Sequence, residues 1–191
     1  MARAKPATRR ARDVKPLIEA MGPPVARARW SPEFAVQSIE IFPVALGEDG
    51  GAIWFKPVHA DSLRVAMRRG VAAAELVLEV IGWYPLEPIV VHSTSWREED
   101  GRVVLTYVTV VRRPESLPPG SLDAAPVRRH ALARGETLAA PARVEVAAVL
   151  EHAFRHLAWL LQDDPAIGRA LPDWRGILAE YVPEPFRALP A

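Results

Sequence analysis

The segment from His92 to Arg97 holds the greatest variety of reactive side chains in the chain. An imidazole, three small hydroxyls, an indole and a guanidinium follow one another directly. A guanidinium binds anions through parallel hydrogen bonds, and an indole offers a flat face for stacking. We therefore expect a site for a small anionic or nucleotide-like ligand, lined by His92, Ser93, Ser95, Trp96, Arg97 and Tyr107. The alternative is a half-exposed strand stabilised by cross-strand pairs of hydroxyls.

Two further pairs have the i, i+4 spacing that brings side chains together on a helix. Glu75 and Glu79 form either a reduced, catalytic site for a divalent metal or the solvated face of an amphipathic helix. His152 and His156 place two imidazoles within reach of one metal ion, but no third ligand follows at a suitable spacing. We favour a surface or interface pair of histidines. No cofactor is predicted, except Mg²⁺ if the two glutamates are catalytic.

The composition indicates a globular protein with one hydrophobic core, since 191 residues with half of them hydrophobic suffice for a full domain. Cysteine is absent, which excludes disulfides, thiolate nucleophiles and cysteine-ligated zinc. The longest apolar stretch, at 103–111, is interrupted by threonines and is far too short to span a bilayer. The first fifteen residues contain no apolar block, so we expect a cytoplasmic protein without a secretory signal or membrane partner.

Residues 1–30 are expected to form a basic, disordered arm ahead of a single globular domain at 31–191. Residues 1–15 carry six basic side chains against one aspartate, whereas the whole chain has a formal net charge of +1. Such an arm is suited to nucleic acid or an acidic partner. It also has the composition of an organelle transit peptide, or it is only a solvated tail.

The elements that position the candidate residues can be predicted from periodicity and turn residues. Residues 34–42 alternate as a strand does, 47–51 form a turn, and 53–55 form a return strand. A long helix is predicted over 61–82, with Asp61 as its N-cap. Gly70 in its middle indicates close packing or a local break. Its apolar stripe comprises Leu63, Met67, Val71, Ala74, Leu78 and Ile81.

A second hairpin follows, in which residues 89–97 pair with residues 102–111 through an Asp100-Gly101 type I′ turn. This turn places Ser95 opposite Thr106, Trp96 opposite Leu105 and Thr94 opposite Tyr107. Because β-branched residues are dense over 103–111, we expect that segment to be a central, mostly buried strand. After a proline-rich connection at 113–126, a second long helix is predicted over 142–162. Two short helices begin near Asp164-Pro165 and Pro172-Asp173.

This succession of strand, return strand, long helix, hairpin and long helix resembles the Nudix fold over about residues 34–162. The resemblance implies an α+β protein in which a mixed β-sheet is packed between two long helices, as an α/β/α sandwich. Short C-terminal helices over 163–191 would then be an extension. The family's first helix carries the pattern Gly-x5-Glu-x7-Arg-Glu-U-x-Glu-Glu-x-Gly-U, where U is bulky and aliphatic. Its carboxylates hold a divalent metal against a diphosphate.

Placing the last glycine of that pattern on Gly82 puts Glu79 on the first of the paired glutamates. Glu75 then stands where the family has arginine, and Leu76 and Val80 stand at two acidic positions. Neither aliphatic side chain binds metal or accepts a proton. The resemblance therefore implies a Nudix-like scaffold with a degenerate box.

Three functions stay open at this point. The missing carboxylates favour a non-catalytic binding or regulatory module for a nucleotide-like or anionic ligand or a protein partner. The alternative is a divergent Mg²⁺-dependent phosphoanhydride hydrolase that uses Glu75 and Glu79. The third is a nucleic-acid-associated protein that acts through the basic arm.

Overall fold

The structure, a computed structural model, describes residues 36–99, 102–132 and 144–181. The chain divides by its contacts into two units, Met1–Ser31 and Pro32–Ala191, and the described residues belong to the second. The predicted basic arm, the Asp100-Gly101 turn and the first two residues of the helix predicted over 142–162 lie outside the described residues. In the described part of the chain, no helix is long and apolar enough to cross a membrane.

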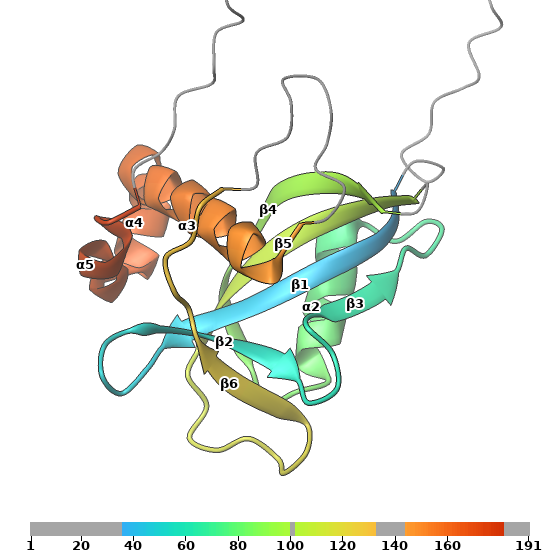
Figure 1. Cartoon of the computed structure of the whole chain (residues 1–191), viewed down its shortest axis with the longest axis horizontal. Coiled ribbons are helices and arrows are strands. Elements are labelled where there is room, and N and C mark those ends of the chain that lie inside the picture. The colour runs from blue at the N-terminus through green and yellow to red at the C-terminus, as the bar shows by residue number, and fades with distance from the viewer. Residues whose placement is uncertain (1–35, 100–101, 133–143, 182–191) are drawn as a thin grey trace, which may run out of the picture. The chain divides into compact units, whose positions relative to one another are not determined.

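The described residues form a mixed six-stranded sheet around β1 (Val36–Leu46), which is the blue central arrow in Figure 1. β1 runs parallel to β5 and antiparallel to both β2 and β3. The strand order is β4-β5-β1-β2-β6, with β3 paired to β1. The other strands are β2 (Ala52–Pro57), β3 (Leu63–Ala66), β4 (Glu87–Glu99), β5 (Arg102–Arg112) and β6 (Leu122–Pro126).

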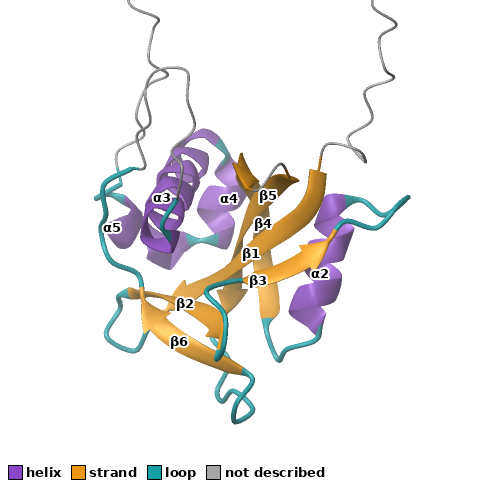
Figure 2. Cartoon of the chain, turned by 45° about the vertical axis from the view of Figure 1, so that its right-hand side comes forward, coloured by secondary structure: helices purple, strands orange, loops and turns teal. Residues whose placement is uncertain are grey.

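Two helices cover opposite faces of this sheet, and Figure 2 shows them on its two sides. On one face, α2 (Ala73–Gly82) buries an aliphatic stripe against Ile39 and Ile41 of β1. On the other, α3 (Val146–Asp163) packs against Phe42 and Val44. Successive strand residues point to opposite faces, so β1 supplies both cores by alternation. The short helices α4 (Pro165–Ala170), η2 (Pro172–Trp174) and α5 (Arg175–Leu178) follow α3.

The predicted α+β, three-layer arrangement is confirmed, but the helix predicted over 61–82 is wrong in its first half. Leu63–Ala66 is the strand β3, and only α2, from Ala73, is helical. Gly70 has a φ of 76°, a left-handed conformation that favours glycine and breaks any continuous helix. A four-residue strand here pairs with the edge of β1 that β2 leaves open, which supplies backbone hydrogen bonds. The predicted connection at 113–126 likewise contains the unpredicted strand β6.

The hairpin of β4 and β5 is confirmed, and β5 lies between β4 and β1 as a mostly buried strand. Ser95 pairs with Thr106 and Trp96 with Leu105, as predicted. Tyr107 faces Ser93 instead of Thr94, because the register shifts between Ser93 and Ser95. The long C-terminal helix and the two short ones are also confirmed, and Asp164 caps α4 by accepting a hydrogen bond from the Ala166 amide at 2.7 Å.

Candidate functional site

A buried carboxylate, Glu40, stands on the face of β1 that also carries Phe42 and Val44. Only 3% of Glu40 is exposed. A carboxylate removed from water is stable only when cations and hydrogen-bond donors surround it. The sequence folds so that β3 and the β4–β5 hairpin bring such groups to it.

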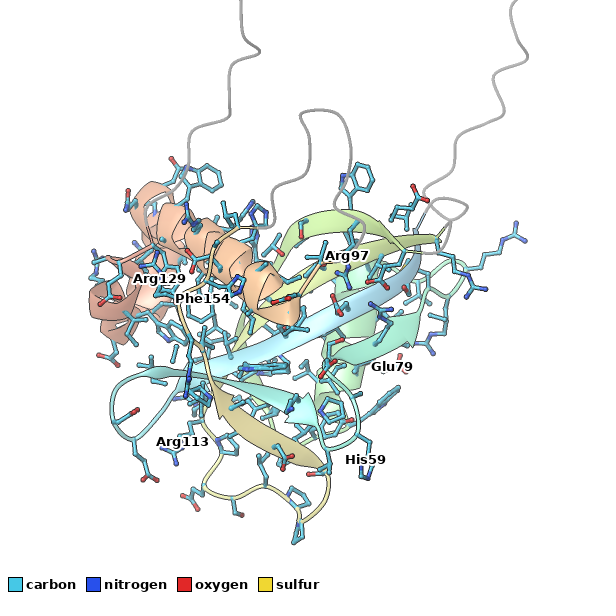
Figure 3. All side chains as sticks on the ribbon, in the orientation of Figure 1. His59, Glu79, Arg97, Arg113, Arg129 and Phe154 are labelled. Carbon is cyan, nitrogen blue, oxygen red and sulfur yellow. The ribbon has the colours of Figure 1, made fainter. Side chains whose placement is uncertain are left out.

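Glu40 belongs to a ring of ion pairs with two arginines and a second carboxylate. The other members are Arg97, which Figure 3 labels, Arg64 and Glu99. Arg97 Nη1 lies 2.5 Å from Glu40 Oε2, and Arg97 Nη2 lies 2.7 Å from Glu99 Oε1. Arg64 lies 3.3 Å from Glu40 Oε1 and 2.7 Å from Glu99 Oε2. The Ser62 hydroxyl donates a hydrogen bond to Glu40 at 2.7 Å, and Thr106 Oγ1 accepts one from Arg97 at 3.2 Å.

The ring stabilises the charged forms of Arg97 and Glu99. Burial opposes the charge on Arg97, but the hydrogen bonds and negative charge of Glu40 and Glu99 outweigh burial and raise its pKa. The hydrogen bond from Arg64, together with that from Arg97, lowers the pKa of Glu99. Both carboxylates are therefore committed to guanidinium partners, which oppose the approach of a metal cation.

A pocket of about 530 Å³ opens beside this ring and is lined by Ser38, Arg64, Val65, Ala66, Glu99, Arg102 and Val104. Its walls combine a serine hydroxyl, two guanidinium groups and a carboxylate with small aliphatic side chains. Arg102 is exposed, and no ion pair or hydrogen bond joins its side chain to any other described residue. Together with Arg64 and Arg97 it makes three guanidinium groups against the two carboxylates of the ring, so one positive charge has no ion-pair partner among the described residues.

The six predicted ligand residues are not brought together. The register places His92, Ser95 and Arg97 on the face that α3 covers, where their pairing partners include Val108 and Thr106. Ser93, Trp96 and Tyr107 point to the α2 face; Tyr107 is buried there, and Trp96 is 70% exposed. None of the six lines the pocket, although Arg97 holds two of its neighbours through the ring.

Glu75 and Glu79 are both exposed on α2 and line no described pocket. The carboxylate of Glu79 is taken by the guanidinium of Arg68, from the turn that precedes the helix. Across the described ranges, no group of three or more histidine, aspartate or glutamate side chains is placed to hold a metal ion. This face of α2 therefore presents the two glutamates to solvent.

His152 and His156 are half-buried and not at an open surface, because α3 lays them against β4. His156 lies 4.6 Å from His152 and 5.8 Å from His92 between ring centroids. Burial, with the neighbouring imidazoles, lowers the pKa of His156 to about 4. Burial also lowers the pKa of His92 and, with Arg155 nearby, that of His152. The three rings are neutral at neutral pH.

Sequence reasoning missed Glu40, Arg64 and Arg102, which define the charged ring and the rim of the pocket. One signal was available for Glu40. Glu40 lies on the same face of its strand as Phe42 and Val44, and the other face is apolar as well. A strand with two apolar faces is buried on both, so a glutamate within it is expected to be buried too. No local pattern signals its partners, because they come from β3 and from the β4–β5 hairpin.

No protein-family model matches the chain, and no curated protein matches it. Among solved structures, the chain is similar to RenU, a Nudix hydrolase from M. smegmatis, with 10% sequence identity and a TM-score of 0.36. The match covers 77% of this chain and 89% of that one. In the structure itself, a mixed sheet lies between α2 and α3, as the order of strands and helices predicted.

Proposed function

We propose that the chain is a non-catalytic module that binds a small organic anion in the pocket beside the Glu40 ring. The uncompensated guanidinium of Arg102 at the rim is the observation that carries this proposal. A guanidinium that no protein carboxylate occupies attracts phosphate or carboxylate groups by charge and by its fork of donors.

The rest of the pocket supports a ligand with an apolar body. Val65, Ala66 and Val104 line one part of it, so a flat or aliphatic group gains from leaving water there. The volume of about 530 Å³ is in the range of small-molecule sites, on the order of 300–1,000 Å³. A nucleotide-like molecule has this combination of charge and apolar surface.

The state of the carboxylates favours binding over hydrolysis. Hydrolysis of a phosphoanhydride in the Nudix manner needs several carboxylates that are free to hold Mg²⁺. In this chain Glu40 and Glu99 are held by arginines, and Glu79 is held by Arg68. A metal ion would have to displace a guanidinium at each of them.

The experiment measures the affinity of wild type for AMP, ADP and inorganic phosphate by calorimetry. We expect Arg102→Gln to weaken the binding of a nucleotide about tenfold or more, because a hydrogen bond to a charged group contributes about 1.5–3 kcal/mol. Arg112→Gln is the matched control, since Arg112 is an exposed arginine at the other end of β5 that pairs with Glu87. Equal affinities of Arg102→Gln and wild type would contradict the proposed site.

A turnover assay separates binding from the hydrolase alternative. Wild type, Glu75→Gln and Glu79→Gln are incubated with dinucleotides and sugar nucleotides in the presence of Mg²⁺ or Mn²⁺. Negligible turnover by all three proteins is the expected result. Robust metal-dependent turnover that Glu79→Gln abolishes would overturn the non-catalytic proposal, whatever the pocket binds.

A further inference from the structure

The three histidines between α3 and β4 belong to neither the pocket nor the ring of ion pairs. Two come from successive turns of α3, and the third, His92, comes from the edge strand of the sheet. Their ring centroids form a chain of 4.6 Å and 5.8 Å steps with His156 in the middle. Three titratable groups therefore meet where the helix lies on the sheet.

We propose that His92, His152 and His156 form an acid-operated catch that holds α3 on β4 while the rings are neutral and loosens that contact when they take up protons. Like charges at such distances repel, and the half-buried rings have little water to screen them. The α3 helix is the element that would respond, because buried hydrophobic residues such as Phe154 and Leu157 make the core contacts on this face of the sheet and do not titrate.

Two features show that the cluster is built for the neutral state. The Nε2 atom of His92 is buried and has no hydrogen-bond partner in the described part of the chain, so a proton added there would find no acceptor among these residues. His156 has both of the other rings as neighbours, and burial with their influence lowers its pKa to about 4. His152 makes one compensating contact, a hydrogen bond with the backbone of Thr94.

Among the described residues, the charged groups on the surrounding elements give the protonated rings no stabilising partner. On α3, Arg155 lies near His152 and adds to the repulsion, while the carboxylate of Glu151 is bound by Arg129 and by Arg155 itself. On β4, Arg97 is held in the Glu40 ring. The neighbouring strand β5 places the apolar Val108 opposite His92. The helix α4 also contacts β4, and its one charged residue is the exposed Arg169.

The sign of the pH dependence follows from the lowered pKa values. An unfolded histidine takes up a proton near its ordinary pKa of 6.5, whereas folded His156 does so near 4. Between these values the unfolded chain binds more protons than the folded chain, so stability falls as the pH falls. The catch is closed above about pH 6.5 and weakens progressively towards pH 4.

The first test is a proton NMR titration of the full chain, whose five histidines are few enough to follow one by one. We expect the resonances of His92, His152 and His156 to titrate below the ordinary range, in step with changes in the α3 amide signals. Titration of all three in the ordinary range, or of the rings without any change in α3, would overturn the proposal. This test requires no variant to fold.

The second test compares His156→Phe with wild type by urea denaturation at pH 7 and pH 5. Phenylalanine keeps a ring in the same space but does not titrate, so we expect a smaller loss of stability on acidification than in wild type. His59→Gln is the control, because His59 is exposed and outside the cluster, and it should behave as wild type does. An equal acid-induced loss in His156→Phe and wild type would contradict the catch.

Discussion

The α3 side of the sheet carries two polar clusters that solve the same problem in opposite ways. In the Glu40 ring, the charged groups are paired. Arg97 and Arg64 each form ion pairs with Glu40, which is 3% exposed, and with Glu99. In the histidine cluster the described part of the chain supplies no carboxylate partner, and the lowered pKa values keep the three rings uncharged at neutral pH. The cost of burying a polar group is met by pairing in one region and by neutrality in the other.

This difference predicts that the two clusters respond oppositely to the loss of a polar group. Removing one member of the paired cluster leaves a buried charge without its partner in apolar surroundings. Removing a polar atom from the neutral cluster relieves a group that had no partner. The four predictions below test this contrast, from the largest expected effect to the smallest.

The largest effect should come from Glu40→Gln. The amide cannot balance Arg97, whose side chain is 14% exposed, so we expect the free energy of unfolding to fall by about 3–5 kcal/mol, as for other broken buried pairs. Urea denaturation at pH 7 measures it. The control is Glu87→Gln, which breaks an exposed pair with Arg112 and should cost about 0.5 kcal/mol or less. Similar losses for both variants would show that the ring has no special role.

Acid should separate the two clusters into different pH windows. The histidine cluster destabilises the fold as the pH falls from about 6.5 towards 4. The pKa of Glu99 is lowered, so its contribution is complete above its ordinary value of 4.5 and is lost only below that value. In a series of denaturation curves, Glu99→Gln should therefore flatten the low-pH loss and leave the loss between pH 6.5 and 5 unchanged. A change confined to the upper window would reverse the assignment.

Thr106→Val tests how much the ring depends on its neutral partners. Thr106 is 1% exposed, and its hydroxyl oxygen accepts a hydrogen bond from Arg97 at 3.2 Å. Valine has nearly the same shape and no acceptor, so we expect a loss of about 1–2 kcal/mol, smaller than for Glu40→Gln. Denaturation at pH 7 measures it, and a gain in stability would show that the guanidinium does not need this contact.

The smallest change in the free energy of unfolding should be an increase, opposite in sign to the losses above. His92→Phe removes a buried nitrogen for which no described residue is a hydrogen-bond partner, and it fills the space with an apolar ring. We expect the free energy of unfolding at pH 7 to rise by about 1 kcal/mol, because an unsatisfied polar group is lost. A clear loss of stability would mean that His92 makes a needed polar contact and that the neutral cluster does not differ from the ring.

The sequence predicted the elements whose patterns are local. The β4–β5 hairpin, its core strand and the helix that carries Phe154 all follow from periodicity and turn residues. β3 was predicted as helix because Leu63 and Met67 continue the four-residue spacing of the true helix that follows. Pairing with the open edge of β1 outweighs that weak local preference.

The candidate site was predicted only in fragments, since its contacts join residues distant in the chain. Arg97 was predicted as an anion-binding residue because of its guanidinium, but in the structure it pairs with Glu40. Glu40 stands between two isoleucines in the sequence, so it was not recognised as a buried residue. The i, i+4 spacing found His152 and His156, and no spacing rule connects them to His92 on a strand. Strand alternation alone divides the six predicted ligand residues between two faces, and the bulge at Thr94 only exchanges the faces of His92 and Ser93. Nothing in the local sequence indicates a bulge there.

The parallel pairing of β1 with β5 has a consequence for the order in which the chain folds. Ile39 lies beside Leu105 and Ile41 beside Tyr107, so the central strand gains this neighbour only after the intervening strands and α2 have been made. The β4–β5 hairpin closes a short loop and can form early, whereas docking β1 beside it closes a long one. During synthesis, β1 emerges with only β2 and β3 as available partners. The strand that supplies both hydrophobic cores therefore keeps an unpaired apolar edge until the β4–β5 hairpin has been made.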